Sequence, residues 1–261
     1  MHTFTKDELI KSLREIAARG WIESSRLGNH GSIGNTLEDL LGIEENNLPI
    51  PNASEWELKT QRLQTSSLTT LFHSEPSPQA LKFVPSILLP LYGWPHKEAG
   101  KKYASIEMSF RQTIHGLARS DRGFMVQVDR AEKKVLISFD ASAVSPRHSG
   151  WLKDVERKVG LRELQPQPYW GFEDLEHKVG VKLANCFFVQ AAIKREQGKE
   201  YYKYERATML KGLDFEGFLE CLEAGVVLVD FDARTGHNHG TKFRIRQNSL
   251  PLLYREKTIL F

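Results

Sequence analysis

A short stretch at 52–59, Asn-Ala-Ser-Glu-Trp-Glu-Leu-Lys, combines the residue types best suited to chemistry in this chain. Side chains alternate along a strand, so Glu55, Glu57 and Lys59 share one face, and the tryptophan and leucine between them point the other way into a core. Carboxylates bind Mg²⁺, and a nearby ammonium stabilises a phosphorane or holds a nucleophilic water. The stretch therefore indicates a site for a divalent cation and a phosphate oxygen. The alternative is an amphipathic edge strand whose charges face solvent and pair across it.

A second candidate set lies at 234–244, Arg-Thr-Gly-His-Asn-His-Gly-Thr-Lys-Phe-Arg. A His-x-His pair is a common zinc signature, but glycines flank His237 and His239, and no carboxylate follows at ligand spacing, so zinc is disfavoured. Arginine binds guanine O6 and N7 in a bidentate way, and histidine donates to the same acceptors. A glycine-rich loop that recognises a DNA groove is favoured, and a purely structural loop is the alternative.

Two further features lie upstream of both sets. The segment Thr36 to Leu41 has helical spacing with Leu37 and its neighbours facing inward, and Gly42 is a candidate C-cap. Glu38 is the one residue of that helix that packing does not explain. The preceding loop, Ser24 to Gly34, carries Arg26, Asn29, His30 and three glycines, and either brings backbone close to a phosphate or turns a corner.

Composition sets the limits for these sites. The chain has 261 residues, enough for one large domain or two smaller lobes, with a net charge of +3. A DNA-binding surface must therefore come from local clustering of basic residues. Cys186 and Cys221 lie in a predicted strand and a predicted helix, outside any Cys-x-x-Cys pair, so we expect reduced thiols in a cytosolic protein. The pattern predicts neither a signal peptide nor a membrane span.

Periodicity predicts the elements that position the candidate residues. A packing helix over 5–19 begins at Thr5 and precedes the loop described above. Extended segments at 65–73, 106–116, 123–128 and 134–139 follow, the last three as a meander, after a proline-rich ordered wrap over 75–102. The remaining predicted helices span 151–159, 172–179 and 215–224. The remaining predicted strands span 182–192, 199–205, 226–231 and 257–261.

Five blocks of the sequence, in order, resemble the MvaI/BcnI group of restriction endonucleases, which is related to the mismatch-repair nicking enzyme MutH. The blocks are Gly-Asn-Thr-Leu-Glu-Asp-Leu-Leu-Gly (34–42), Glu-Trp-Glu-Leu-Lys-Thr (55–60), Ser-Leu-Thr-Thr-Leu-Phe-His (67–73), Tyr-Tyr-Lys-Tyr (201–204) and His-Asn-His-Gly-Thr-Lys-Phe-Arg (237–244). The resemblance implies an α/β fold with a PD-(D/E)xK nuclease core, a mixed sheet flanked by helices. It also implies one endonuclease unit over 1–261 with catalytic and DNA-recognition lobes. The catalytic motif would lie in 34–73 and the main base-recognition loop in 233–246.

The resemblance assigns catalytic roles to four residues. It implies that Glu57 is a metal-binding carboxylate, that Lys59 is the motif lysine and that Glu38 is the supporting helix glutamate. Position 52, where the family has its first aspartate, holds Asn52. A neutral amide is a poorer Mg²⁺ ligand than a carboxylate, so either the change disables the site or Glu55 or Glu38 supplies the missing charge.

The implied mechanism is Mg²⁺-dependent hydrolysis of a DNA phosphodiester. Mg²⁺ held by Glu57, position 52 and the Leu58 carbonyl lowers the pKa of a bound water, and Lys59 orients that water for in-line attack. Cleavage leaves 5′-phosphate and 3′-hydroxyl ends.

The resemblance also implies a set of DNA-contacting residues. With the basic loop near the N-terminus included, these are His73, Arg234, His237, His239, Lys242, Arg244, Arg26 and Asn29. His73 falls where enzymes of this group that read a central C:G pair place a second histidine. We expect His73 and one of His237 or His239 to donate to guanine O6, which favours CCSGG over CCWGG among CCNGG-type sites. The alternative for His73 is a packing role behind Phe72.

The expected partner is double-stranded DNA, bound by a monomer that nicks the two strands in separate events, without a membrane. A cognate DNA methyltransferase would act on the same site without forming a stable complex. Three alternatives stay open from the sequence. They are a MutH-like nickase directed by partner proteins, a sequence-specific DNA-binding protein made catalytically silent by Asn52, and a globular protein without a DNA role.

Overall fold

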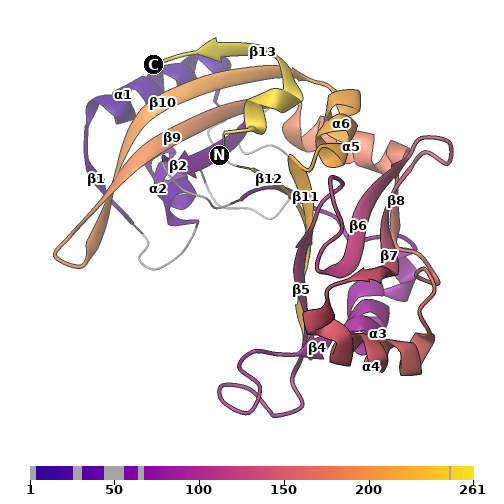
Figure 1. The fold of residues 1–261 in the computed structure, drawn as a ribbon. Helices are drawn as coiled ribbons and strands as arrows, with labels where there is room; N and C mark the ends of the chain where they lie inside the picture. The colour runs from indigo at the N-terminus through magenta and orange to yellow at the C-terminus, as the bar shows by residue number, and fades with distance from the viewer. Residues whose placement is uncertain (1–3, 26–30, 44–55, 64–67, 247) are drawn as a thin grey trace. The chain divides into compact units, whose positions relative to one another are not determined.

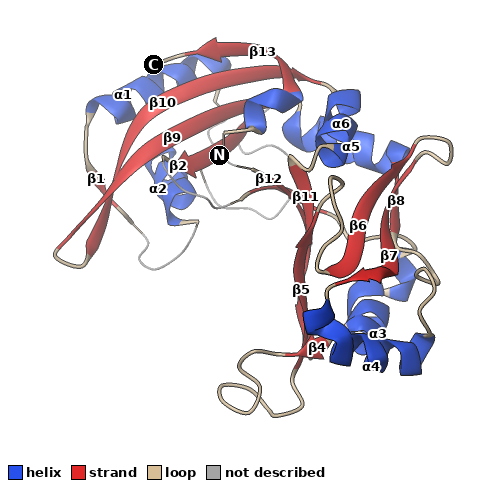
Figure 2. Cartoon of the chain, viewed as in Figure 1, coloured by secondary structure: helices blue, strands red, loops and turns tan. Residues whose placement is uncertain are grey.

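The computed structural model describes residues 4–25, 31–43, 56–63, 68–246 and 248–261 (Figure 1). The chain forms two compact units, each assembled from separate segments. Unit 1 comprises Met1–Thr69, His177–Gly217 and Gln247–Phe261, and unit 2 comprises Thr70–Glu176 and Phe218–Arg246. Both units contain helices and strands (Figure 2).

Unit 1 is built on a five-stranded mixed sheet of order β1-β10-β9-β2, with β13 paired to β10. The β2–β9 pair is parallel, and the other neighbours are antiparallel. The strands are β1 (Ile22–Glu23), β2 (Glu57–Arg62), β9 (Asn185–Glu196), β10 (Lys199–Leu213) and β13 (Tyr254–Ile259). The helices are α1 (Lys6–Ala18), α2 (Ser32–Leu41) and a 3₁₀ turn at Leu250–Leu253. The helices α5 (Phe172–Leu183) and α6 (Phe215–Glu223) each span a boundary between the units.

The first helix forms where its N-cap signal predicts. The Thr5 hydroxyl accepts the Glu8 backbone N–H at 3.3 Å, and the Glu8 carboxylate accepts the Thr5 N–H at 2.8 Å, which completes a capping box. The helix is the predicted packing helix, because its apolar stripe buries Leu9, Leu13 and Ile16 in the core of unit 1. Sequence and structure agree closely here because cap and stripe are local signals.

The helix α2 begins earlier than the sequence predicts. Ser32–Gly34 belong to the helix and not to a loop, and Gly42 ends it in the left-handed conformation, as predicted. A Cβ on Gly34 would lie 2.9 Å from the Thr60 hydroxyl oxygen, so the glycine permits α2 to lie close to β2. This helical glycine serves a close contact, which explains why the glycine-rich segment resembles a loop in sequence.

A polar cluster joins α2, β2 and β10 inside unit 1. The Glu200 carboxylate accepts hydrogen bonds from Tyr202 and Arg195 and pairs with Arg62 at 3.3 Å. The Ser32 hydroxyl lies 2.5 Å from the Tyr202 hydroxyl. The cluster ties the start of α2 to the end of the strand that carries Glu57 and Lys59.

Unit 2 contains two antiparallel sheets and several short helices. One sheet has the order β3-β12-β11-β5-β4, and the other has the order β6-β7-β8. The strands are β3 (Thr69–His73), β4 (Trp94–Pro95), β5 (Met108–Ile114), β6 (Arg122–Asp129), β7 (Lys134–Val144), β8 (Tyr169–Gly171), β11 (Val227–Arg234) and β12 (His237–Ile245). The helices are α3 (Leu89–Tyr92), α4 (Ser149–Val159), 3₁₀ turns at Gln79–Leu81 and Pro146–His148, and a π-helical turn at Val84–Leu88.

Two sequence expectations are wrong in unit 2. The three predicted meander strands belong to two sheets, because β5 pairs with β11 while β6 pairs with β7. The predicted recognition loop over 233–246 is largely a strand, since β12 forms a hairpin with β11. Local alternation identifies a strand but not its partner, and the two glycines of the hairpin mimic the composition of a loop.

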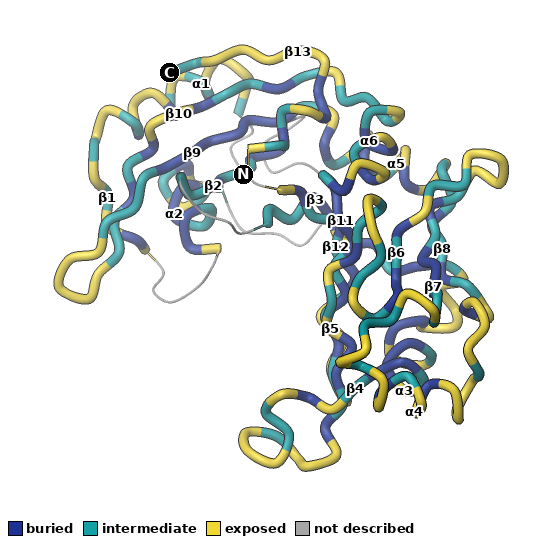
Figure 3. Tube along the Cα trace, in the orientation of Figure 1, coloured by how far each residue is buried: buried dark blue, intermediate teal, exposed yellow. Residues whose placement is uncertain are grey.

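The core of unit 2 is aromatic. The Phe243 ring lies 4.8 Å from Phe72 and 5.2 Å from Trp170, and Phe110 contacts Phe124 and other rings nearby. Buried residues run along strands such as β9 and β11, whereas β13 and the hairpin ends are mostly exposed (Figure 3). The two sites described next are charged strand faces that lie outside these apolar cores.

The two cysteines lie in a strand and in a helix, as predicted. Cys186 is buried in β9 and Cys221 is half-buried in α6, and both thiols are free. Among the described residues, no helix combines the length and apolar character needed to cross a membrane.

Candidate functional site

On the side of β2 that carries Glu57 and Lys59, a buried carboxylate lies between two ammonium groups. Glu57 is only 2% exposed. Its Oε1 lies 2.7 Å from the Lys59 Nζ, and its Oε2 lies 3.2 Å from the Lys182 Nζ. Trp56 and the leucine at 58 lie in the apolar core of unit 1. The predicted division of the strand into a charged face and an apolar face is confirmed.

This burial would be costly without the lysines. A carboxylate withdrawn from water loses its hydration, and only close cations and hydrogen bonds offset the loss. The two lysine side chains are themselves mostly buried, with 15% and 20% of their surface exposed. An amphipathic edge strand with solvated charges is therefore excluded for Glu57, and positive charge is concentrated around one acidic group.

Lys182 is a site residue that the sequence analysis missed. It was expected as the first residue of a strand, but it lies in the last turn of α5. Leu175, Val179 and Leu183 are buried at intervals of four residues. This spacing extends the predicted helix through Leu183 and is the signal that could have placed Lys182 on it.

In the sheet of unit 1, the residue opposite Glu57 is a cysteine. Glu57 stands opposite Cys186 in the parallel β2–β9 register. Burial raises the pKa of Cys186 to about 12, although the charge of Lys59 lowers it. The thiol therefore stays protonated and behaves as a small apolar group beside Glu57.

Glu38 is half-buried on α2, which packs along β2. Ser32 lies near Arg62, and Gly34 lies against Thr60, so the helix and the strand run in opposite directions. Four helical residues beyond Gly34 cover about 6 Å, close to two strand residues. Glu38 therefore lies toward the end of β2 at which Glu57 stands.

Several predicted residues lie outside the described part of the chain. These are Asn52, Glu55, Arg26 and Asn29. No cluster of three His, Cys, Asp or Glu side chains that could hold a metal occurs among the described residues. Glu57 supplies one hard oxygen ligand, and β2 ends the strand order of its sheet, which suits a backbone carbonyl as a second ligand. The described residues thus fit part of a Mg²⁺ site.

In unit 2, the outward face of β11 carries a row of ion pairs. Asp230 pairs with Arg244 at 3.2 Å and accepts the Thr113 hydroxyl at 2.7 Å. Asp232 pairs with Arg111 at 2.7 Å and with Lys242 at 3.4 Å.

Arg234 closes the row by pairing with the buried Glu107 at 3.0 Å, and its guanidinium lies 4.6 Å from the centre of the Tyr103 ring. The predicted residues Arg234, Lys242 and Arg244 therefore share one sheet face, which we call the charged face.

A β-bulge brings His237 to the charged face. One residue of β11, Asp232, stands opposite two residues of β12, His239 and Gly240, and Gly240 has a φ of +82°. The extra residue shifts the alternation, so His237 stands opposite Arg234. The His237 and His239 rings are nearly parallel, with centroids 6.4 Å apart. Both histidines are exposed.

His73 lies beside the same bulge. A Cβ on Gly240 would lie 3.3 Å from the His73 ring, and β3 neighbours β12 in the sheet. His73 is exposed, whereas Phe72 fills the core, so the packing alternative for His73 is not supported. Glu75 fixes the bulge by accepting the Thr241 N–H at 2.9 Å and hydroxyl at 3.1 Å. The three predicted histidines thus gather around Gly240.

The acidic members of the charged face were also missed by the sequence analysis. They are Asp230, Asp232 and Glu107. Alternation of Asp-Phe-Asp-Ala-Arg over 230–234 places the two aspartates on the face of Arg234, and this pattern could have identified them.

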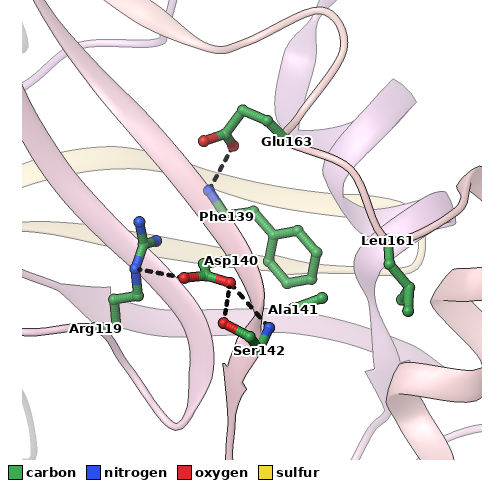
Figure 4. A pocket seen from close by; sticks show the side chains of 7 residues that line it. All are labelled: Arg119, Phe139, Asp140, Ala141, Ser142, Leu161 and Glu163. Atoms are coloured by element: carbon green, nitrogen blue, oxygen red, sulfur yellow. Dashed lines mark hydrogen bonds and ion pairs between the residues drawn. The ribbon is translucent and has the colours of Figure 1, made fainter.

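A pocket of about 580 Å³ in unit 2 is lined by Arg119, Asp140 and Glu163, among others (Figure 4). Its polar groups bond to one another. Glu163 accepts the Phe139 N–H at 2.6 Å, and Arg119 donates to the Gly123 carbonyl at 2.9 Å. Hydrogen bonds from Ser142 hold the pKa of Asp140 below its ordinary value. The groups are mutually satisfied, so the pocket is not a candidate site.

Comparison with known proteins identifies similar solved structures and a matching family. Two solved structures of another protein are similar over almost the whole chain. "Restriction endonuclease MvaI-cognate DNA substrate complex" is 24% identical, with a TM-score of 0.77, and covers 99% of this chain and 100% of that one. "Restriction endonuclease MvaI in the absence of DNA" is 25% identical, with a TM-score of 0.55, and covers 100% of both chains.

No curated protein sequence matches the chain. The model of the MvaI/BcnI restriction endonuclease family matches residues 10–254. The resemblance noted in the sequence is thereby confirmed, and the mixed α/β fold is that of MvaI. The chain belongs to the MvaI/BcnI restriction endonuclease family.

Proposed function

We propose that this chain is a Mg²⁺-dependent type II endonuclease that cleaves double-stranded DNA at CCNGG-type sites, with CCSGG favoured. The observation that carries the proposal is the buried Glu57 carboxylate held between Lys59 and Lys182. Such a group is ready to bind a hard cation on one side and to present ammonium groups to a phosphate on the other.

Each residue has a role in this proposal. Glu57, the Leu58 carbonyl and position 52 would hold the metal, and Lys59 would orient the attacking water and stabilise charge on the phosphate. Mg²⁺, when bound, lowers the pKa of that water. Lys182 acts as a positioning residue, because its ion pair with Oε2 fixes the rotation of the carboxylate. Glu38 supports the same end of β2.

Asn52 decides whether this chain is active. The test is plasmid cleavage with Mg²⁺ by this chain and by the Asn52→Asp variant, with the product ends sequenced. Cleavage within CCNGG-type sites by the variant alone indicates an endonuclease disabled at one metal ligand. Cleavage by both indicates that Glu55 or Glu38 supplies the missing charge. If neither cuts, the proposal fails.

A second candidate function is sequence-specific DNA binding without cleavage, and the asparagine at position 52 is the observation that favours it. The same assay distinguishes it when paired with a binding measurement. Salt-dependent binding to CCNGG duplexes, with no cutting by the parent chain at any Mg²⁺ concentration, would support the silent protein.

The base preference rests on the histidines around Gly240. His73 with His237 or His239 would donate to guanine O6 at the central pair, and the cations of the charged face would contact the outer guanines. The aspartates beside them suit cytosine N4. The test compares cleavage of CCSGG and CCWGG duplexes by Asn52→Asp with and without His73→Ala. Unchanged discrimination at the central pair would remove His73 from the proposal.

We further propose that the protein acts as a monomer, since one chain supplies one Glu57 site and one charged face. Strand cleavage would then occur in two successive nicks. Accumulation of open-circular plasmid before the linear form would support this order, whereas linear product without a nicked intermediate would contradict it.

A further inference from the structure

The segment 96–107, which we call the lysine loop, joins β4 to β5 in unit 2. It is folded by its own hydrogen bonds. The His96 N–H donates to the Glu107 carbonyl at 2.8 Å, and the Glu98 N–H donates to His96 Nδ1 at 3.1 Å. The His96 and Tyr103 rings meet edge to face at 4.8 Å. The loop therefore presents its remaining side chains from a defined frame.

Three lysines project from this frame. Lys97, Lys101 and Lys102 are exposed, and no ion pair with a carboxylate is found for them within the described part of the chain. On the charged face, in contrast, Arg111, Arg234, Lys242 and Arg244 each pair with an aspartate or glutamate. The three lysines of the lysine loop thus carry positive charge that no described carboxylate pairs with, whereas the cations of the charged face are already paired.

The loop is attached to that face. Tyr103 and Glu107 both come from the loop, and they hold the Arg234 guanidinium between ring and carboxylate. The Thr235 N–H, at the turn of the β11–β12 hairpin, donates to the Met108 carbonyl at 3.1 Å, and the Met108 N–H donates to the Thr235 hydroxyl at 3.0 Å. The lysines therefore have a fixed place relative to Arg234.

We propose that the lysine loop binds the sugar-phosphate backbone of the DNA outside the recognised base pairs and supplies sequence-independent affinity. The proposal rests on the proposed function, because it takes duplex DNA as the ligand of the charged face. Unpaired lysines suit phosphates, which carry charge but no sequence information, whereas paired arginines and aspartates suit base edges. The lysine loop would thus supply affinity for any DNA sequence, and the charged face would supply specificity for the recognised site.

The test compares Lys97→Gln/Lys101→Gln/Lys102→Gln with the parent chain. Binding is measured without Mg²⁺ between about 50 and 200 mM salt, on a duplex that contains CCSGG and on one of equal length without any CCNGG site. A matched control, Lys82→Gln/Lys133→Gln/Lys153→Gln, removes the same charge from other exposed positions of unit 2. Lysine-to-arginine replacements at the three loop positions should preserve binding.

We expect the slope of log affinity against log salt to become shallower by about 1 for each lysine lost. Affinity at low salt should fall by about tenfold or more, by the same factor on both duplexes. A slope equal to that of the control triple variant would overturn the proposal. A loss confined to the CCSGG duplex would also overturn it, because it would mean that the loop reads bases.

Failure of the proposed function would give a different result from failure of the lysine-loop proposal. In that case the parent chain would show no preference for the CCSGG duplex, and Asn52→Asp would not cut. The slope on the duplex without a site would still report on the loop.

Discussion

The two units use carboxylates in different ways. In unit 1 a single buried carboxylate, Glu57, receives two lysines, so positive charge converges on one point. In unit 2 three acidic groups are spread out, with Asp230 and Asp232 on β11 and Glu107 just before β5, and each pairs with at least one cation of the same face. Two cations around one carboxylate suit chemistry at a single phosphate. An alternating row of hydrogen-bond donors and acceptors suits recognition of base edges.

From this contrast we expect the acids of the two units to control different properties. Removal of the acid in unit 1 should abolish chemistry and leave recognition intact. Removal of an acid in unit 2 should release a cation and therefore strengthen non-specific binding while weakening discrimination. The predictions below test this division, beginning with the largest effect.

The largest effect is expected for Glu57→Gln in the Asn52→Asp background. The single-turnover cleavage rate should fall by at least about 10³-fold, more than the roughly 10²–10³ lost with one stabilising hydrogen-bond donor. Binding to a CCSGG duplex without Mg²⁺ should persist, because the charged face lies in the other unit. Glu205→Gln, at an exposed pair with Lys203, is the control. Loss of specific binding with Glu57→Gln would contradict the assignment of cleavage to unit 1 and of recognition to unit 2.

The two lysines around Glu57 should not be equivalent. Lys59→Gln should lower the cleavage rate by about 10²–10³-fold, since Lys59 is proposed to contact the water and the phosphate. Lys182→Gln should cost about tenfold, as expected when a group that orients a ligand is lost. Partial rescue by Lys182→Arg would show that the ion pair is the important feature. Equal losses for both lysines would assign Lys182 a direct role.

In unit 2, Asp230→Asn should uncouple affinity from specificity. Arg244 would lose its pairing carboxylate, so discrimination between a CCSGG and an unrelated duplex should fall by about 1–3 kcal/mol. Non-specific affinity should rise because one negative charge is removed. Asp154→Asn removes the same charge on the exposed side of α4, where Asp154 pairs with Arg157. If both variants behave alike, net charge rather than the charged face explains the result.

The smallest effect concerns stability. Burial raises the pKa of Glu200, but hydrogen bonds from Tyr202 and Arg195 and the charge of Arg62 lower it more, so the pKa in the folded state lies below the ordinary value. A lowered pKa stabilises the fold above the unfolded-state pKa, and this stability is lost as the pH falls through the folded-state pKa.

Glu200→Gln should therefore reduce the free energy of unfolding by about 1–3 kcal/mol at neutral pH. The difference from the parent should shrink below a pH of about 4.3, the ordinary glutamate pKa. Urea titrations at neutral and acid pH measure both quantities, with Glu15→Gln as an exposed control. A difference that does not depend on pH would mean that shape, and not charge, determines the loss.

The features that sequence analysis predicts well are local. The Thr5 capping box, the Gly42 C-cap and the two faces around Glu57 depend on residues within a few positions of one another. Their physical causes are orphan backbone groups at helix ends and the alternation of side chains in a strand. Family resemblance adds the catalytic and DNA-contacting roles, which remain predictions.

The features that it misses depend on distant partners. Lys182 reaches Glu57 only because α5 ends beside β2 after an excursion of more than one hundred residues. The bulge at Gly240 places His237 opposite Arg234, and the sequence alone does not show this strand register. The partner of β5 is likewise chosen by packing across the whole of unit 2. Local pattern could not provide these contacts, because each is set by tertiary structure.

The parallel register of β2 and β9 sets the order in which the nuclease can be assembled during synthesis. Glu57 and its ladder partner Cys186 are separated by about 130 residues. A ribosome that adds about 5–20 residues per second therefore needs roughly 6–26 s to supply the strand on which Glu57 depends. Until then the catalytic strand has no neighbour in its sheet, and Lys182 emerges only just before that neighbour. A chain that ends before Lys182 therefore lacks both the second lysine and the strand beside Glu57, and it also lacks the β11–β12 hairpin that carries Arg234 and His237.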